Sequence, residues 1–547
     1  MTRLSLYLDR VIDAGLIFLV VFTPLAFGTV EVWSVSIAQF VVVLVFAAWV
    51  LKVVWGPKPL VIHLDEDGTH GRASRSGLRR WRGLFGGRVV LSGLEWPAVL
   101  FGLLIIAQMI PLPLEWLEAV QPRTAEVVRK MAPPADTEGR TTVRAVEAWL
   151  LGRHDPVSAG GQRPAGSAGD AESVVPDHEL SLGGQSRHGL SLSSAATRHK
   201  LEIYLAYLAI FVVGVNHWRD RRHADRVVFA IAGTGGLLAL VGILQRVTRP
   251  DRILWLRPAS EGHPPFGPFV NHNHFAGYME MAVPVALGLA WLIHEQARLM
   301  HDPSARLLDL GESVVPRFML LLATAIFGTV ALLACRSRGG LLAFLMAVSV
   351  YLGLAPWRRG RWARSALAGL LLVAMAVGVA ARVGGDDLWE HYTTLSNPSG
   401  EPSFEFRLET SRRTLAMARD FPVTGVGLGV FQEVYPAYAP GNRVRRTGAA
   451  HDDYAQLLAE TGAVGGLLAL VAIVIFLLRF LVPALARTGS PRRHLTHGIA
   501  VGCLALAIHS AFDFNLQIYS NGLLFVILAA LLAADRIARI PRPGGVT

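Results

Sequence analysis

The sequence predicts an all-α integral membrane protein that crosses the bilayer about twelve times. Of its 547 residues, 52% are hydrophobic and only 17% are charged, whereas soluble proteins carry about 25% charged residues. The mean hydropathy is +0.41. Apolar runs long enough to cross about 30 Å of hydrocarbon at 1.5 Å per residue recur along the chain. These observations exclude a typical soluble enzyme.

Twelve apolar runs qualify as membrane-spanning helices. They are residues 11–30, 35–55, 94–110, 201–217, 227–244, 275–293, 318–335, 340–354, 366–381, 464–481, 499–512 and 523–534. The first is not a cleaved signal peptide, because it lacks a small-residue cleavage site and a second run follows directly. Cys335 and Cys503 lie in or beside these runs without a CxxC or histidine-spaced pattern, so we expect both to be packing residues.

Arginine-rich short segments predict the orientation. With the N-terminus inside, the cytoplasm receives 72–88, 217–226, 357–364, 487–493 and 536–542, as the positive-inside rule requires. The same count places 111–200, 246–274 and 384–462 outside. This topology explains most of the net charge of +11, so we expect the lipid bilayer as a partner and no nucleic acid.

The predicted topology divides the chain into five parts. They are N-terminal spans with a basic cytoplasmic loop at 56–93 (1–110), an outer and partly disordered insert (111–200), central spans (201–383), an outer loop that holds candidate catalytic residues (384–462), and C-terminal spans with a basic cytoplasmic tail (463–547). The insert is rich in Gly, Ser, Ala and His from 152 to 197. We expect its lone His178 and His188 to be solvated.

The loop 384–462 holds basic charge on the outer side. Its arginines are Arg407, Arg412, Arg413, Arg419, Arg443, Arg445 and Arg446. An amphipathic helix is predicted over 404–420, capped by Ser403 and ended by Pro422, with Phe404, Leu408, Leu415 and Ala418 on one side and Arg407 and Thr414 on another. Arg407 either binds a phosphate with its fixed guanidinium or contacts solvent and lipid headgroups.

Two further patterns follow in this loop. Gly425, Gly427 and Gly429 lack a preceding strand and the final x-x-G of a dinucleotide fingerprint, so we expect a tight turn at the bilayer edge. His451 then starts a helix that Gly462 ends, with Asp452 and Asp453 in its first turn. The helix dipole favours a neutral imidazole, which suits a general base or a neutral hydrogen-bond partner, although His451 could also simply cap the helix.

The remaining polar residues lie at the outer ends of spans. His272 and His274 with the distant Glu280 make a poor metal set, so we expect hydrogen bonding at the span entrance and no metal. Glu280, inside an apolar run, is predicted to be functional or paired.

Two other groups lie at the same depth. Placing the charges of Arg336 and Arg338, in CRSRGG, at the outer end of a span costs free energy unless an anion binds them. Phosphate is the anion that we expect. His509 and Asp513 are four residues apart on one predicted helical face, which favours a structural pair over direct catalysis.

Five motifs together resemble the bacterial O-antigen ligase and polymerase superfamily over about residues 266–521. They are NHNHFAGYMEM, SRGG, FRLETSRRTLAMARDFPVTGVGLG, AHDDYAQLLAETG and HSAFDFNLQ. The segment before Lys200 departs from the usual pattern. The resemblance implies a GT-C-like, metal-independent, inverting glycosyltransferase that needs no cofactor and lies in the inner membrane with its active site facing the periplasm.

The resemblance also implies substrates and residue roles. The donor is a glycan on undecaprenyl diphosphate, and the acceptor is a lipid A core, a carrier-linked glycan or a protein side chain. Arg338 and Arg407 would hold the diphosphate, and His451 would assist the acceptor hydroxyl. A transporter or flippase for lipid-linked sugars is the alternative, although the polar motifs gather at one face, whereas carriers place their site near the midplane.

Overall fold

The computed structural model describes residues 3–55, 89–131, 188–259, 265–300, 314–354, 402–439 and 447–539. Up to residue 354, the helices are α1 (Arg3–Leu25), α2 (Val32–Trp55), α3 (Glu95–Met109), α4 (Leu114–Val120), α5 (Pro122–Met131), α7 (Ser194–His217), α8 (Arg221–Thr248), α9 (His272–Met300), α10 (Val314–Ala334) and α11 (Arg338–Leu354). From residue 402 on, they are α14 (Pro402–Asp420), α15 (Phe431–Val434), α16 (Asp453–Phe476), α17 (Val482–Leu485), α18 (Arg493–His509) and α19 (Tyr519–Ala538).

Little other regular structure occurs in these ranges. Two 3-10 turns, Tyr435–Tyr438 and Asn515–Gln517, follow α15 and precede α19, and a π-helical turn, Leu477–Leu481, joins α16 to α17. Strands β1 (Arg252–Ile253) and β2 (Arg257–Pro258) form a short antiparallel pair in which Arg252 lies opposite Pro258.

The all-α polytopic class is confirmed. Eleven of the twelve predicted spans coincide with described helices, and the ninth, 366–381, lies outside the described residues. Among the described residues, seven helical segments are long and apolar enough to cross a membrane: α2, α7, α8, α9, α10, α16 with its continuation to Leu485, and α19. Cys335 and Cys503 are free and buried, as expected for packing residues.

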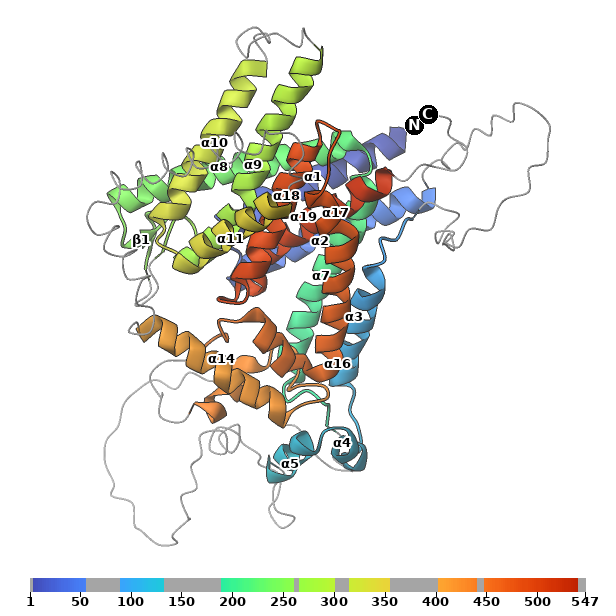
Figure 1. The fold of residues 1–547 in the computed structure, drawn as a ribbon. Coiled ribbons are helices and arrows are strands. Elements are labelled where there is room, and N and C mark those ends of the chain that lie inside the picture. Colours follow the sequence, from blue (N-terminus) through green and yellow to red (C-terminus); the bar gives the residue numbers. More distant parts are fainter. Residues whose placement is uncertain are drawn as a thin grey trace, which may run out of the picture.

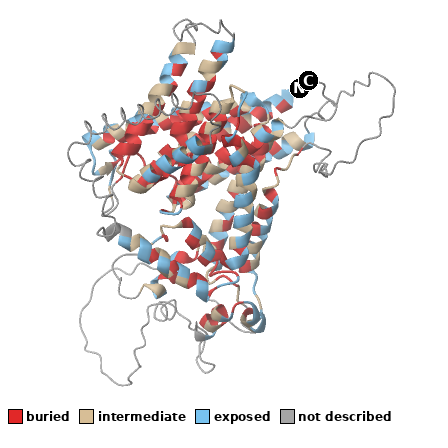
Figure 2. Cartoon of the chain, viewed as in Figure 1, coloured by how far each residue is buried: buried red, intermediate tan, exposed pale blue. Residues whose placement is uncertain are grey.

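Helix α9 forms the centre of the helical body. It packs against α8, α10 and α18, and Figure 2 shows buried residues concentrated around it. The contact with α18 is close because glycine replaces side chains there. A Cβ at Gly498 would lie 2.1 Å from the carbonyl oxygen of Pro284, and one at Gly502 would lie 3.0 Å from Cα of Met281. Small residues of this kind let membrane helices approach closely.

Helices α3, α7 and α16 connect this body to α14. They lie side by side and reach α14, α4 and α5 at the lower side of Figure 1. Much of α16 faces outward: Leu467 and Leu470 on it, and Leu478 in the π-helical turn that follows, are more than half exposed. Leucines exposed along a span are what a lipid-facing helix requires.

The two ends of the molecule differ in their polar contacts. One end, here called the basic end, is closed by ion pairs: Lys52–Asp9, Arg226–Asp13, Arg492–Asp225, Arg493–Glu295 and Arg487–Asp535. The other, the α14 end, carries α14, residues 421–439 and 447–452, and Asp513. At the basic end α1, α8 and α18 begin and α2, α7 and α19 end, as the predicted alternation of spans requires.

Two parts of the insert at 111–200, residues 111–131 and 188–200, are among the described residues. Helices α4 and α5 lie in the insert, and His188 is half-buried and pairs through its backbone with Leu112. Burial lowers the pKa of His188, so the prediction of a solvated histidine is wrong at this position. His178 lies outside the described residues.

Candidate active site

Asp513 lies at the centre of the α14 end. It follows α18, and its carboxylate is completely buried. Its Oδ1 atom lies 3.2 Å from Nδ1 of His451, and its Oδ2 atom lies 3.6 Å from Nη2 of Arg407. Arg407 also donates a 3.0 Å hydrogen bond from Nη1 to the carbonyl of Phe512. One carboxylate thus holds two side chains that come from separate segments.

The pKa of Asp513 is held well below its usual range. Burial alone would raise it, but the hydrogen bond from His451 and the positive charge of Arg407 outweigh burial. An ionised carboxylate only accepts hydrogen bonds, so Nδ1 of His451 carries a proton. In the neutral ring this leaves Nε2 unprotonated, which is the form that a general base needs.

The backbone fixes His451 in place. Its φ of +55° lies in the left-handed region, which non-glycine residues seldom adopt outside constrained sites. Asp452 caps α16 by accepting hydrogen bonds from the N–H groups two and three residues later, so the alternative that His451 merely caps the helix is wrong. The predicted helix end at Gly462 matches a break in α16: Gly462 has non-helical dihedrals with φ +62°, and a second helical segment runs from this kink to Phe476.

The helix that carries Arg407 matches its predicted extent but not its predicted faces. α14 starts at Pro402, so Ser403 lies inside its first turn and is not the cap. Ala418 is buried as expected, but Leu408 and Leu415 are about 40% exposed. The buried face instead includes Thr410, Thr414 and Met417. The threonines can be buried because their hydroxyls donate to carbonyls four residues earlier.

The SRGG segment forms the start of α11 against α9. Arg336 has a φ of +63°, and α11 begins at Arg338. A Cβ at Gly340 would lie 2.7 Å from Cβ of Ala276 and 2.9 Å from Oε1 of Glu280. Only glycine therefore lets this helix start approach α9, and both arginines stay half-buried there. A helix N-terminus beside arginines favours an anion.

Glu280 and His509 form a buried pair beneath this segment. Nδ1 of His509 lies 2.7 Å from Oε1 of Glu280, and both side chains are completely inaccessible. The prediction that Glu280 is paired is confirmed. The predicted pair of His509 with Asp513 is wrong, because α18 ends at His509 and Asp513 turns toward His451 instead.

Further buried polar atoms gather between α9, α18 and α16. Six have no hydrogen-bond partner among the described residues: Nε2 of His274, Oε2 of Glu280, Nε2 of His509, Oγ of Ser510, Oδ2 of Asp513 and Nδ2 of Asn515. Buried polar atoms normally find partners in protein or solvent. The interior between these helices is therefore polar.

Comparison with known families agrees with this chemistry. Residues 323–471 match the family described as O-antigen ligase. This stretch is therefore similar to the O-antigen ligase family. The resemblance to the O-antigen ligase and polymerase superfamily is thereby confirmed, and it supports a role in making or attaching polysaccharides at a membrane. No curated protein matches the chain.

The stretch that matches the O-antigen ligase family contains only part of the candidate site. Arg336, Arg338, Arg407, His451 and Asp452 lie within the matched residues, whereas the other polar groups lie outside them: His272, His274, Glu280, His509 and Asp513. The rings of His274 and Phe514 meet edge to face at 4.7 Å, and those of His451 and Phe514 at 5.0 Å. Sequence reasoning missed Phe514, since its position depends on the turn after α18.

The glycine string, which lies within the matched stretch, forms the predicted tight turn. Gly425, Gly427 and Gly429 all have positive φ, and a Cβ at Gly425 would lie 2.2 Å from the backbone of Glu460. Glu460 accepts hydrogen bonds from the N–H groups of Gly429 and Phe431. The turn therefore packs directly on α16 and supports the segment leading to His451. It does not form a nucleotide-binding loop.

The α14 end offers no convergent metal ligands within the described residues. His272 begins α9 and is half-buried, and His274 lies within electrostatic range of His451 and Asp513. Neither belongs to the one group of three donors found in the described part of the chain, which lies at the basic end.

Proposed function

We propose that this protein transfers a glycan from an undecaprenyl diphosphate carrier to an acceptor hydroxyl at the periplasmic face of the bacterial inner membrane. One observation carries the proposal: Asp513 contacts both His451 and Arg407, so a general base and an anion-binding group lie together. A lipid A core, a carrier-linked glycan and a protein side chain are acceptors that the same chemistry serves.

In the proposed reaction, Nε2 of His451 takes the proton of the acceptor hydroxyl. The oxygen of that hydroxyl attacks the anomeric carbon of the donor glycan at the same time. The bond from that carbon to the diphosphate oxygen breaks, and the electron pair leaves with undecaprenyl diphosphate. Arg338 and Arg407, with Arg336 beside them, stabilise this charge, which makes the step independent of a metal. A single in-line displacement inverts the anomeric configuration.

Asp513 has a positioning role in this scheme. It keeps the Nδ1 proton on His451 and fixes the guanidinium of Arg407 through the two contacts described above. His509 and Glu280 support the start of α11, because the position of a Cβ at Gly339 lies 3.3 Å from Nε2 of His509.

The decisive experiment separates transfer from transport. Purified protein in proteoliposomes receives an undecaprenyl-diphosphate-linked oligosaccharide and a candidate acceptor, and both free carrier diphosphate and donor sidedness are measured. We expect release of the carrier diphosphate together with a new glycan–acceptor product. Movement of intact donor across the bilayer without release would instead support the transporter alternative.

A further inference from the structure

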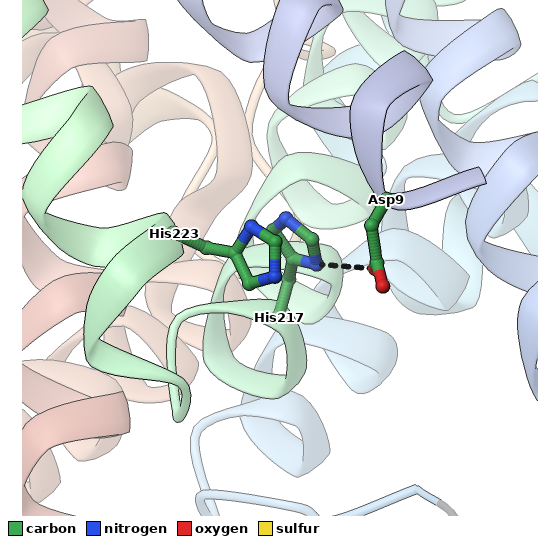
Figure 3. Close-up of side chains that lie close together, drawn as sticks. All are labelled: Asp9, His217 and His223. Atoms are coloured by element: carbon green, nitrogen blue, oxygen red, sulfur yellow. Dashed lines mark ion pairs between the residues drawn. The ribbon is translucent and has the colours of Figure 1, made fainter. Parts of the chain in front are cut away.

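Three polar side chains meet at the basic end, far from Asp513. Asp9 comes from α1, His217 ends α7 and His223 lies in the first turn of α8 (Figure 3). Helix α7 has 24 residues, which corresponds to about 36 Å, and its start lies beside the glycine turn of the α14 end. The cluster therefore belongs to neither the donor nor the acceptor site proposed above.

Their donor atoms converge. One donor atom from each residue lies within 4.8 Å of the other two. The imidazole rings lie side by side with centroids 4.1 Å apart, and Nδ1 of His217 lies 3.6 Å from Oδ1 of Asp9. The centre of a triangle with 4.8 Å edges is about 2.8 Å from each corner, so shifts of about 0.7 Å give the 2.0–2.1 Å distances of zinc ligands.

A second carboxylate orients both imidazoles. Asp13 lies 2.8 Å from Nε2 of His217 and 2.8 Å from Nδ1 of His223. As an acceptor it keeps the protons on those nitrogens, so the lone pairs of Nδ1 of His217 and Nε2 of His223 remain for a ligand. Histidines that bind zinc commonly donate their other N–H to a carboxylate in this way.

An orphan atom points into the cluster. Nδ1 of His217 is buried and has no hydrogen-bond partner among the described residues, and the side chain of His217 is completely inaccessible. A buried ring nitrogen normally has a partner. Because its nearest polar neighbour, Asp9, is at 3.6 Å, the gap between them has room for an ion bound to both.

We propose that Asp9, His217 and His223 bind a Zn²⁺ ion, with water as the fourth ligand. Two imidazoles and one carboxylate suit zinc, whereas Mg²⁺ and Ca²⁺ prefer oxygen alone. The ion ties together α1, α7 and α8 at the basic end. It stabilises the helical body and takes no part in glycan transfer.

Lys52 competes with the ion for Asp9. Its ammonium group contacts Oδ1 of Asp9 at the end of α2, and its side chain is 30% exposed, so it can move into solvent when zinc arrives. Arg226 contacts Asp13 and compensates the charge of that carboxylate. Removing the lysine charge should therefore raise the affinity for zinc, which distinguishes a metal site from a purely salt-bridged cluster.

The experiment uses the full chain, purified in detergent with a tag that contains no histidine. Protein is stripped with a chelator and titrated with Zn²⁺, and bound metal and the thermal unfolding midpoint are measured. We expect one zinc per chain and a higher midpoint with zinc. His223→Ala and Asp9→Asn should lose the bound zinc, Asp13→Asn should weaken affinity about 10- to 100-fold, and Lys52→Gln should tighten it.

His494→Ala is the matched control. His494 pairs with Glu295 at the same end of the molecule but belongs to no group of three donors among the described residues, so this variant should bind zinc like the parent. The proposal is overturned if the parent binds no zinc, or if zinc binding is the same in the parent, His223→Ala and Lys52→Gln. Lys52→Gln is expected to bind zinc more tightly than the parent, so the test remains decisive even where the other variants fold poorly.

Discussion

His451 and Asp513 are 62 residues apart in the sequence, yet Nδ1 of one lies 3.2 Å from Oδ1 of the other. Asp513 is completely buried and ionised, so it fixes which ring nitrogen of His451 carries the proton. A buried carboxylate behind a histidine is an arrangement that presents a base and holds its orientation. The first two predictions below follow from this contact and from the contact of Asp513 with Arg407.

The first prediction concerns His451. His451→Ala should leave donor affinity nearly unchanged while lowering the single-turnover rate of transfer about 10²- to 10⁴-fold, the contribution typical of one general base. The reason is that the proposed base acts on the acceptor and not on the diphosphate. Donor binding and single-turnover kinetics in nanodiscs measure the two separately. Parental transfer by this variant would contradict the assigned role.

A second prediction concerns Asp513. Asp513→Asn preserves shape but removes the negative charge, so it should slow transfer and also weaken donor binding, because Arg407 loses its anchor. Asp452→Asn is the control: asparagine also caps helices well, so transfer and stability should stay near parental values. If both variants behave alike, the contact of Asp513 with His451 has no special role.

The pKa of Asp513 adds a stability test to the same variant. Its native pKa lies well below the unfolded value of about 3.9. The ionised form therefore stabilises the fold above about pH 4, and this contribution is lost as the pH falls further. The gap in unfolding midpoint between the parent and Asp513→Asn should be constant from pH 8 to about pH 5 and narrow below about pH 4. A difference in midpoint that widens below about pH 4 would show that folding raises the pKa of Asp513 instead of lowering it.

The third prediction compares arginine with lysine. Arg338→Lys and Arg407→Lys keep the charge but lose the planar two-point contact with a diphosphate. Losing one charge-assisted hydrogen bond of about 1.4 to 2.8 kcal/mol corresponds to about 10- to 100-fold weaker donor binding or transfer. Arg412→Lys on the exposed side of α14 should have no effect. If Arg338→Lys and Arg407→Lys both bind the donor and transfer glycan normally, these arginines do not bind the diphosphate as proposed.

Sequence patterns predicted the spans well because apolar runs of membrane length carry their own signal. They predicted α14 within two residues of its start, and they singled out His451, Arg407 and Arg338. They could not predict the partner of His451. The spacing of His509 and Asp513 indicated a helical pair, but that rule fails where the helix ends, and α18 ends at His509.

Contacts between segments that are distant in the sequence could not be predicted either, because they depend on how the helices pack. Asp9 and His217 are brought together only by the packing of α1 near α7 and α8, and nothing local marks either residue as a ligand. The buried side of α14 was missed because Thr410 and Thr414 satisfy their hydroxyls within the helix. Polar residues that bond to their own backbone can replace an apolar face.

A fourth prediction tests the orientation of the chain. Gly448 is exposed and a Cβ there meets nothing within 4 Å, and Thr488 is exposed in the loop before α18. Gly448→Cys should react with an impermeant thiol reagent added from the periplasmic side, and Thr488→Cys should react only after the membrane is opened. The native cysteines are buried and give little background. The reverse pattern would place the α14 end in the cytoplasm.

The last prediction separates the zinc site from the transfer chemistry. Arginines stabilise the leaving diphosphate in the proposed reaction, and the three convergent donors lie at the other end of α7. Treatment with EDTA should therefore lower the unfolding midpoint of the parent, which loses its zinc, while the transfer rate of the folded fraction stays unchanged. In the Asp9→Asn variant, which should bind no zinc, EDTA should change neither the unfolding midpoint nor the transfer rate. If EDTA abolishes transfer in both proteins and one added divalent cation restores it, a metal acts in the reaction itself. His272 and His274 would then be the first residues to test as its ligands, by measuring cation-dependent transfer in His272→Ala and His274→Ala.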